Sequence, residues 1–178
     1  MAGSFRHYDA DTDQLNFKFV YNPDETAALH ALANRNGSAD IDLFRRIALW
    51  KLDRVLEIPD ETIRRLQGLA TAPDLERDSA EVRKILEELV ECAGIGVPMA
   101  STILKFLRSD VFPIVDVRAY RAIYGRKLYW RQDSAKRNID LYLSYASDVD
   151  RISSATGRPL REIDEQLYCF DLAHNGRI

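Results

Sequence analysis

The strongest constraint on the fold is an apolar stripe of helical period that ends in a glycine turn. The i, i+3, i+4, i+7, i+8 spacing of one helix face is followed by Val82, Ile85, Leu86, Leu89 and Val90. Gly94-Ile95-Gly96 interrupts this pattern. A second helix is predicted from Pro98, which is compatible with this place because a first helical turn tolerates proline well. Residues 82–107 are therefore predicted to form a helix, a tight hairpin and a second helix. The residues expected to face inward on the second helix are Met99, Ile103, Leu104 and either Phe106 or Leu107.

Helical patterns also dominate the rest of the chain. Residues 108–125 read as a loop that bears Asp116, followed by a helix that stops at Gly125. Asp60 is a candidate N-cap of another helix. Further helices are predicted over 23–37, 40–58, 60–70, 134–153 and 158–173, and one short N-terminal strand over 15–21. We expect an all-α protein with a single compact domain spanning residues 1–178, built from two helical lobes that share a core.

Composition excludes several classes of protein. No apolar run is long enough to span a membrane, and the N-terminus has no signal-peptide pattern, so we expect a cytoplasmic protein that does not bind membranes. Two cysteines, Cys92 and Cys169, do not suit a disulfide framework, a zinc site or a four-cysteine iron–sulfur cluster. The three histidines, at positions 7, 30 and 174, are too scattered for a metal cluster or a catalytic triad. We expect a monomer that requires no cofactor.

The net charge of −3 argues against avid nucleic-acid binding, but the charges are unevenly distributed. Residues 97–137 contain nine Lys or Arg and three Asp or Glu. Such a cluster is typical of a surface that faces a polyanion, and equally of a solvated helix face. Within it, two adjacent aromatic residues are combined with cations on both sides, a pattern suited to stacking bases and holding phosphates. These predicted DNA contacts, for which a packed loop is the alternative, are Arg126, Lys127, Tyr129, Trp130 and Arg131.

The glycine turn and a downstream acid could form one site. Glycines at 94 and 96 strip side chains from the turn, and the first N–H groups of the next helix are unpaired, so the turn is suited to hold a phosphate. A plain helical hairpin is the alternative. Pro113 fixes an extended approach to Asp116, which lies in an apolar run where a helix begins. Asp116 is therefore either a buried functional acid or an ordinary N-cap. Asp164 lies on a helix with Ile163 and Leu167, where a structural salt bridge is its expected role.

These residues resemble the helix-hairpin-helix (HhH-GPD) DNA glycosylase superfamily, which includes endonuclease III and the 8-oxoguanine and alkyladenine glycosylases. The features shared with its signature, over roughly residues 82–125, are Gly94-Ile95-Gly96, Ala100-Ser101, Pro113, Val115-Asp116 and Arg121. The chain would be a short, divergent member, with an N-terminal region that shows no clear match. The resemblance implies a helical bundle of this type and a role in base-excision repair of DNA.

The resemblance also implies roles for individual residues. Backbone N–H groups of Gly94, Gly96 and Met99 would hold a DNA phosphate, with further backbone contacts from Arg118 and Arg121. Asp116 would be the catalytic carboxylate. A structural K⁺ or Na⁺ would bind main-chain carbonyls of Val90, Cys92 and Ile95.

One departure limits the chemistry. Bifunctional members carry a Schiff-base lysine where this chain has Pro98, so lyase chemistry at this position is excluded. The resemblance leaves two functions open: a monofunctional glycosylase that hydrolyses the N-glycosidic bond of a damaged or modified base, and a non-catalytic DNA-binding or regulatory module that retains only the fold. The sequence does not identify the base, its pocket or an intercalating wedge.

Overall fold

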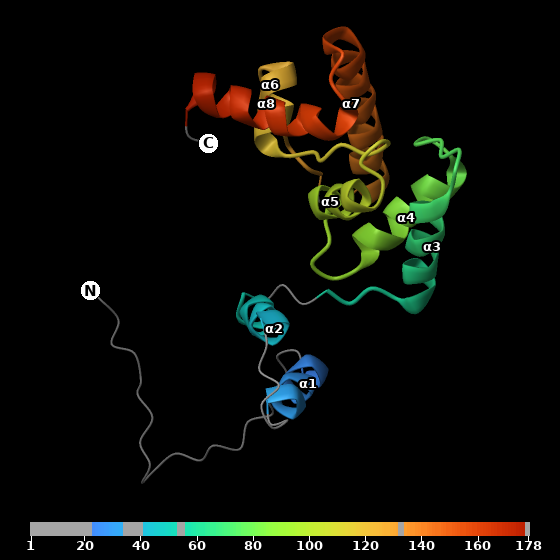
Figure 1. The fold of residues 1–178 in the computed structure, drawn as a ribbon, viewed down its shortest axis with the longest axis vertical. Coiled ribbons are helices and arrows are strands. Elements are labelled where there is room, and N and C mark those ends of the chain that lie inside the picture. The colour runs from blue at the N-terminus through green and yellow to red at the C-terminus, as the bar shows by residue number, and fades with distance from the viewer. Residues whose placement is uncertain (1–22, 34–40, 53–55, 132–133, 177–178) are drawn as a thin grey trace, which may run out of the picture. The chain divides into compact units, whose positions relative to one another are not determined.

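The computed structural model describes residues 23–33, 41–52, 56–131 and 134–176, and in these ranges the only regular secondary structure is α-helix. The helices are α1 Pro23–Ala33, α2 Ile41–Lys51, α3 Asp60–Thr71, α4 Ala80–Glu91, α5 Val97–Leu107, α6 Val117–Tyr124, α7 Ala135–Thr156 and α8 Leu160–Asn175 (Figure 1). The all-α prediction is confirmed for these residues, and the strand predicted over 15–21 lies outside them. None of the described helices has both the length and the apolar character needed to cross a membrane.

The chain divides into two compact units, residues 1–55 and 56–178. In the first unit, α1 and α2 pack together, and Arg46 of α2 donates to both carboxylate oxygens of Glu25 at 3.0 and 2.7 Å. Trp50 Nε1 donates to the hydroxyl of Thr26 at 2.9 Å. The prediction of one domain over residues 1–178 stays a prediction.

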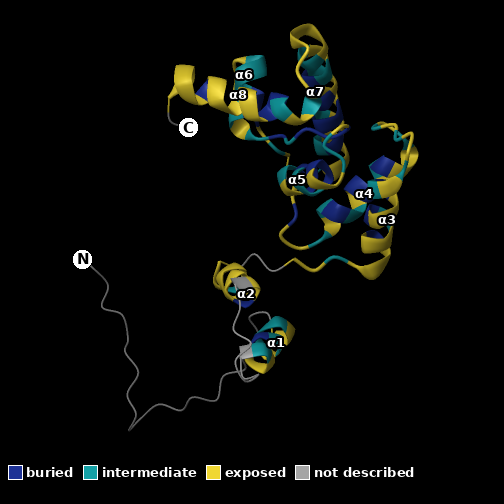
Figure 2. Cartoon of the chain, in the orientation of Figure 1, coloured by how far each residue is buried: buried dark blue, intermediate teal, exposed yellow. Residues whose placement is uncertain are grey.

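The second unit contains the main hydrophobic core. Its central helix is α4, which packs against α3, α5 and α7, while α6 and α7 both pack against α8. The stripe predicted on α4 is confirmed, since Val82, Ile85, Leu86 and Leu89 are fully buried and Val90 is half-buried against the core. Figure 2 shows buried residues concentrated where α4, α5 and α7 face one another. Burial of these apolar side chains is the main force that holds the unit together.

Helix ends in this unit follow the local sequence closely. Side chains of Ser79, Asp116 and Ser134 cap α4, α6 and α7, each accepting from a backbone N–H of the first turn. Gly125 ends α6 in the left-handed conformation, as predicted. The prediction for Asp60 is wrong: it is the first residue of α3, and Pro59 occupies the N-cap position without a side-chain bond.

The predicted inward face of α5 is mostly wrong. Leu104 is buried and Ile103 is half-buried, but Met99 and Leu107 are exposed and Phe106 is 82% exposed. The buried face instead consists of Val97, Ala100, Ser101, Leu104 and Lys105. This stripe also has helical spacing, but it includes Lys105. A lysine is buried only when an acidic partner pairs with its charge, and the sequence near α5 does not show that partner.

Candidate functional site

The hairpin between α4 and α5 leaves a row of backbone N–H groups without acceptors. Cys92 N–H donates to Leu89 O and Ile95 N–H to Cys92 O, each at 3.1 Å. Gly94 has φ +79°, a conformation that a side chain would strain. Among the described residues, the N–H groups of Gly94, Gly96 and Met99 have no hydrogen-bond acceptor. These are the three groups that would hold a DNA phosphate if the resemblance to the glycosylase family is correct.

The start of α5 adds a favourable electrostatic field to these groups. Gly96 is its N-cap and makes no side-chain hydrogen bond, and the first turn contains no acidic residue. Pro98 is the second helical residue and contributes no N–H. The positive end of the helix dipole is therefore not offset by a carboxylate at this end. An anion placed there would meet unpaired N–H groups and a positive potential.

Of the three main-chain carbonyl oxygens predicted to hold a monovalent cation, only one accepts a hydrogen bond from the described residues. Cys92 O accepts from Ile95 N–H, whereas the carbonyl oxygens of Val90 and Ile95 accept no hydrogen bond from the described residues. Carbonyl oxygens are suitable ligands for a hard cation. The cation stays a prediction. No cluster of His, Cys, Asp or Glu side chains in the described ranges could hold a metal ion.

Asp116 begins α6 and uses one carboxylate oxygen to cap it. Oδ1 accepts from the N–H groups of Arg118 at 2.6 Å and Ala119 at 2.9 Å. The N-cap role considered for Asp116 is therefore confirmed. Oδ2 accepts no hydrogen bond from the described residues, and the residue is half-buried. One oxygen thus fixes the side chain, while the other has no hydrogen-bond donor among the described residues.

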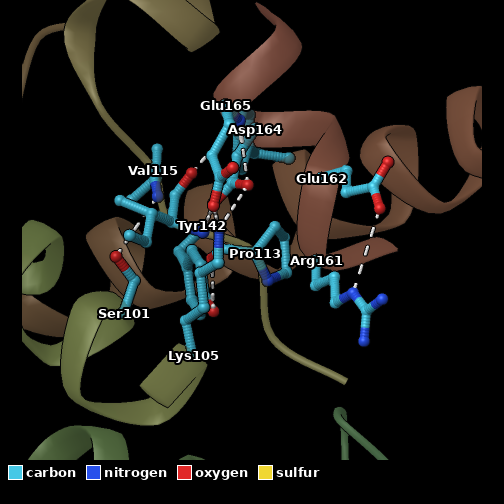
Figure 3. Close-up of polar contacts among 11 residues, drawn as sticks. Ser101, Lys105, Pro113, Val115, Tyr142, Arg161, Glu162, Asp164 and Glu165 are labelled. Carbon is cyan, nitrogen blue, oxygen red and sulfur yellow. Dashed lines mark hydrogen bonds and ion pairs between the residues drawn. The ribbon is translucent and has the colours of Figure 1, made fainter. Parts of the chain in front are cut away.

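The segment just before Asp116 has no regular structure, yet side chains hold its polar backbone groups. From α7, the hydroxyl of Tyr142 donates to Pro113 O at 3.2 Å (Figure 3). The hydroxyl of Tyr145 donates to Ile114 O at 3.0 Å. Burial raises the pKa of both phenols, so both hydroxyls keep the proton that they donate.

Two further side chains hold the N–H groups of this segment. Asp164 of α8 accepts from Ile114 N–H at 2.7 Å, and Ser101 of α5 accepts from Val115 N–H at 3.2 Å. Ser101 in turn donates to Pro98 O at 2.8 Å, in the first turn after the hairpin. The bond from Val115 N–H therefore ties the backbone beside Asp116 to α5, the helix that follows the hairpin.

A buried ion pair joins α5 to α8 beneath this loop. Lys105 Nζ lies 2.6 and 2.9 Å from the carboxylate oxygens of Asp164 and 3.0 Å from Glu165 (Figure 3). Lys105 is 6% exposed and Asp164 3% exposed, so the predicted salt bridge of Asp164 is confirmed and is a buried one.

The two arginines that follow Asp116 are engaged inside the protein. Arg121 donates to both oxygens of Asp171 at 2.7 and 2.8 Å, and Arg118 donates to Asp171 at 3.1 Å and to Gly176 O at 2.9 Å. Asp171 is fully buried, and its hydrogen bonds with Arg121 hold its pKa well below the usual range. Arg118 and Arg121 therefore share one buried carboxylate, which offsets part of their charge and ties α6 to α8.

The ion pairs of Asp171 predict that the stability of the fold decreases at acidic pH. The lowered pKa of Asp171 means that its carboxylate stabilises the fold fully above its ordinary value of 3.8, and that this contribution is lost as the pH falls toward the folded-state pKa. Asp171→Asn should lower the melting temperature at pH 7, and the gap to wild type should narrow below about pH 4. Thermal unfolding between pH 7 and 2 measures this. Asp78→Asn, in an exposed ion pair with Arg83, is the control with little effect. A gap for Asp171→Asn that does not vary with pH would contradict the prediction.

A pocket of about 260 Å³ lies beside Asp116, with most of its wall supplied by α8. Its lining residues are Ile114, Asp116, Asp164, Glu165, Tyr168 and Cys169. The α8 members were missed from the sequence because they are about fifty residues from Asp116. The only local signal was Asp164 itself, an acid on the apolar stripe of a helix.

The predicted contacts after α6 are brought to the surface, with one exception. Arg126, Lys127, Tyr129 and Arg131 are exposed, whereas Trp130 is half-buried and packs against the core.

Comparisons of the chain with protein-family models, curated proteins and solved structures return no match. The resemblance to the helix-hairpin-helix glycosylases therefore stays a prediction from the residues themselves.

Proposed function

We propose that this chain is a DNA-binding protein of base-excision type with an HhH-GPD fold, a monofunctional glycosylase that uses Asp116 as its catalytic carboxylate. The observation that carries the proposal is the coupling through Ser101, which contacts both the first turn of the hairpin helix and the backbone beside Asp116. A phosphate held by the N–H groups of Gly94, Gly96 and Met99 would thereby be kept in register with an acid facing its sugar. Such preorganisation is what a positioned reaction requires.

The proposed reaction is hydrolysis of the bond between C1′ of the sugar and a nitrogen of the base. The base leaves with the bonding electron pair and takes up a proton, and water supplies hydroxyl to C1′ and releases a proton. The free Oδ2 of Asp116 would stabilise positive charge that develops on the sugar or accept the proton of the water. The target base must first leave the stack, and the pocket beside Asp116 is the place proposed for it.

A non-catalytic DNA-binding module is the second candidate, and one observation favours it. The capping bonds to Arg118 and Ala119 give Asp116 a complete structural role without any chemistry. Both candidates require the hairpin to bind DNA, and they differ only in whether a base is released.

Release of a base tests the enzyme directly. The wild-type protein would be incubated with duplexes that each carry one deaminated, oxidised or alkylated base, and abasic sites would be scored as strand breaks after treatment with hot alkali. We expect breaks with at least one class of base and none before the alkali, because lyase chemistry at the position of Pro98 is excluded. Tight duplex binding with no breaks in any arm would favour the non-catalytic module.

The hairpin has a substitution that separates phosphate binding from folding. Gly96 has φ −94°, and a side chain there would meet only Pro98 Cδ, at 3.7 Å, so it can be replaced without strain. Gly96→Asp and Gly96→Asn are both good N-caps and should leave stability unchanged or slightly raised. Only the aspartate repels a phosphate. We expect Gly96→Asp to weaken duplex binding by about tenfold or more relative to Gly96→Asn, as measured by fluorescence anisotropy.

Equal affinities of the two variants, both unchanged from that of the wild type, would show that no phosphate sits at this helix start. Thermal unfolding of both variants checks that the comparison is made between folded proteins.

A further inference from the structure

The arginines of the second unit fall into two groups. Those described between residues 56 and 176 have a carboxylate oxygen within 4.0 Å, except Arg126, Arg131 and Arg137. These three fall within a stretch of twelve residues that also contains Lys127 and Lys136, which likewise have no carboxylate partner among the described residues. All five side chains are exposed. The other arginines described in this unit are paired with carboxylates, whereas these five cations have no carboxylate partner among the described residues.

The loop after α6 presents an aromatic ring among these cations. Leu128 is buried and Trp130 packs against the core, so the residue between them, Tyr129, is directed outward and is 74% exposed. The side chain of Asn138 fixes the end of the loop, accepting from Arg131 N–H at 2.9 Å and donating to Arg131 O at 2.7 Å. A large exposed ring whose neighbours on both sides are anchored loses less conformational freedom when a ligand stacks on it than a ring on an unanchored segment would.

We propose that this surface, formed by residues 126–131 and the first turn of α7, binds an unpaired stretch of nucleic acid, with Tyr129 stacking on a base. Single strands alternate flat apolar bases with phosphates, which matches one exposed ring between Lys127 and Arg131. Bases of an intact duplex are already stacked on both faces, so the ring selects nucleotides outside the helix. The start of α7, which contains no acidic residue in its first turn, adds its dipole to Lys136 and Arg137.

This inference rests on the proposed function only for the identity of the partner as DNA. It adds a substrate class, since DNA with single-stranded or extruded nucleotides would bind more tightly than an intact duplex. The surface shares no residue with the hairpin, so variants of the two can be tested independently.

The test compares the affinity of a fluorescent single-stranded oligonucleotide for four proteins. Tyr129→Ala should weaken binding about tenfold, since loss of one stacked base costs affinity on that scale. Tyr129→Phe keeps the ring and should bind like wild type. The triple substitution of Gln for Arg126, Lys127 and Arg131 should weaken binding and reduce the slope of log affinity against log salt by about 2, because each lost phosphate contact contributes roughly 0.7 on single strands.

The possible results separate this inference from the proposed function. Unchanged single-strand binding by Tyr129→Ala, together with weakened duplex binding by Gly96→Asp, would overturn the stacking surface and leave the hairpin intact. Loss of single-strand affinity in Tyr129→Ala alongside unchanged duplex binding in Gly96→Asp would support the surface and count against the hairpin.

Equal binding of heparin and the oligonucleotide, insensitive to Tyr129, would mean a general polyanion surface and would overturn the inference. Binding to vesicles of anionic lipid in preference to the oligonucleotide would overturn it as well.

Discussion

Asp116→Asn is expected to reduce the release of base from DNA by about 100-fold or more, because an uncharged amide can neither accept a proton nor stabilise positive charge on the sugar. The fold should be preserved. Asparagine is as good an N-cap as aspartate, and its oxygen can still accept from the N–H groups of Arg118 and Ala119. Melting temperature and duplex affinity should therefore stay close to those of the wild type. Rates of abasic-site formation under single-turnover conditions provide the measurement.

Asp116→Ala supplies the matched control for capping. It removes the charge and the cap together, so it should lose both base release and about 1 kcal/mol of stability. If Asp116 is only a cap, Asp116→Asn will match the wild type in every assay and Asp116→Ala will differ only in stability. If Asp116 is catalytic, the two variants will share the loss of activity and differ in stability. The pair distinguishes the two roles even though one carboxylate could perform both.

Local patterns explain why the hairpin could be found from the sequence. The α4 stripe, the left-handed Gly94 and the cap at Asp116 each depend on residues within a few positions of one another. Turn and cap chemistry is encoded at that range, so its prediction needs no knowledge of the tertiary fold. The same holds for the stop of α6 at Gly125.

What holds the loop before Asp116 could not be predicted in the same way. Tyr142, Tyr145 and Asp164 reach this loop from α7 and α8. Each is an ordinary amphipathic-helix residue in its own segment, and its partner is 29 to 50 residues away. The inward face of α5 was predicted wrongly for the same reason. A lysine normally indicates a solvent-facing position, and the carboxylate that pairs with Lys105 inside the protein lies 59 residues further along the chain.

This buried pair yields the largest expected effect on stability. Lys105→Met keeps the length and apolar stem of the side chain but leaves the carboxylate of Asp164 buried without its cation, which should cost about 3–5 kcal/mol. Urea unfolding followed by circular dichroism measures the loss, with an unchanged m-value as the check that the same surface unfolds. Glu165→Gln removes only the exposed partner of Lys105 and should cost less than about 1 kcal/mol.

The double variant Lys105→Met, Asp164→Asn tests the reason for the loss. Asparagine removes the unpaired charge while its oxygen can still accept from Ile114 N–H, so at least about half of the lost stability should return. A cost below about 1 kcal/mol for Lys105→Met, or no recovery in the double variant, would show that the pair does not hold α5 to α8. Because Asp164 also holds the backbone two residues before Asp116, Lys105→Met should slow base release more than it weakens duplex binding. The double variant should recover activity and stability together, which would connect the buried pair to the placement of Asp116.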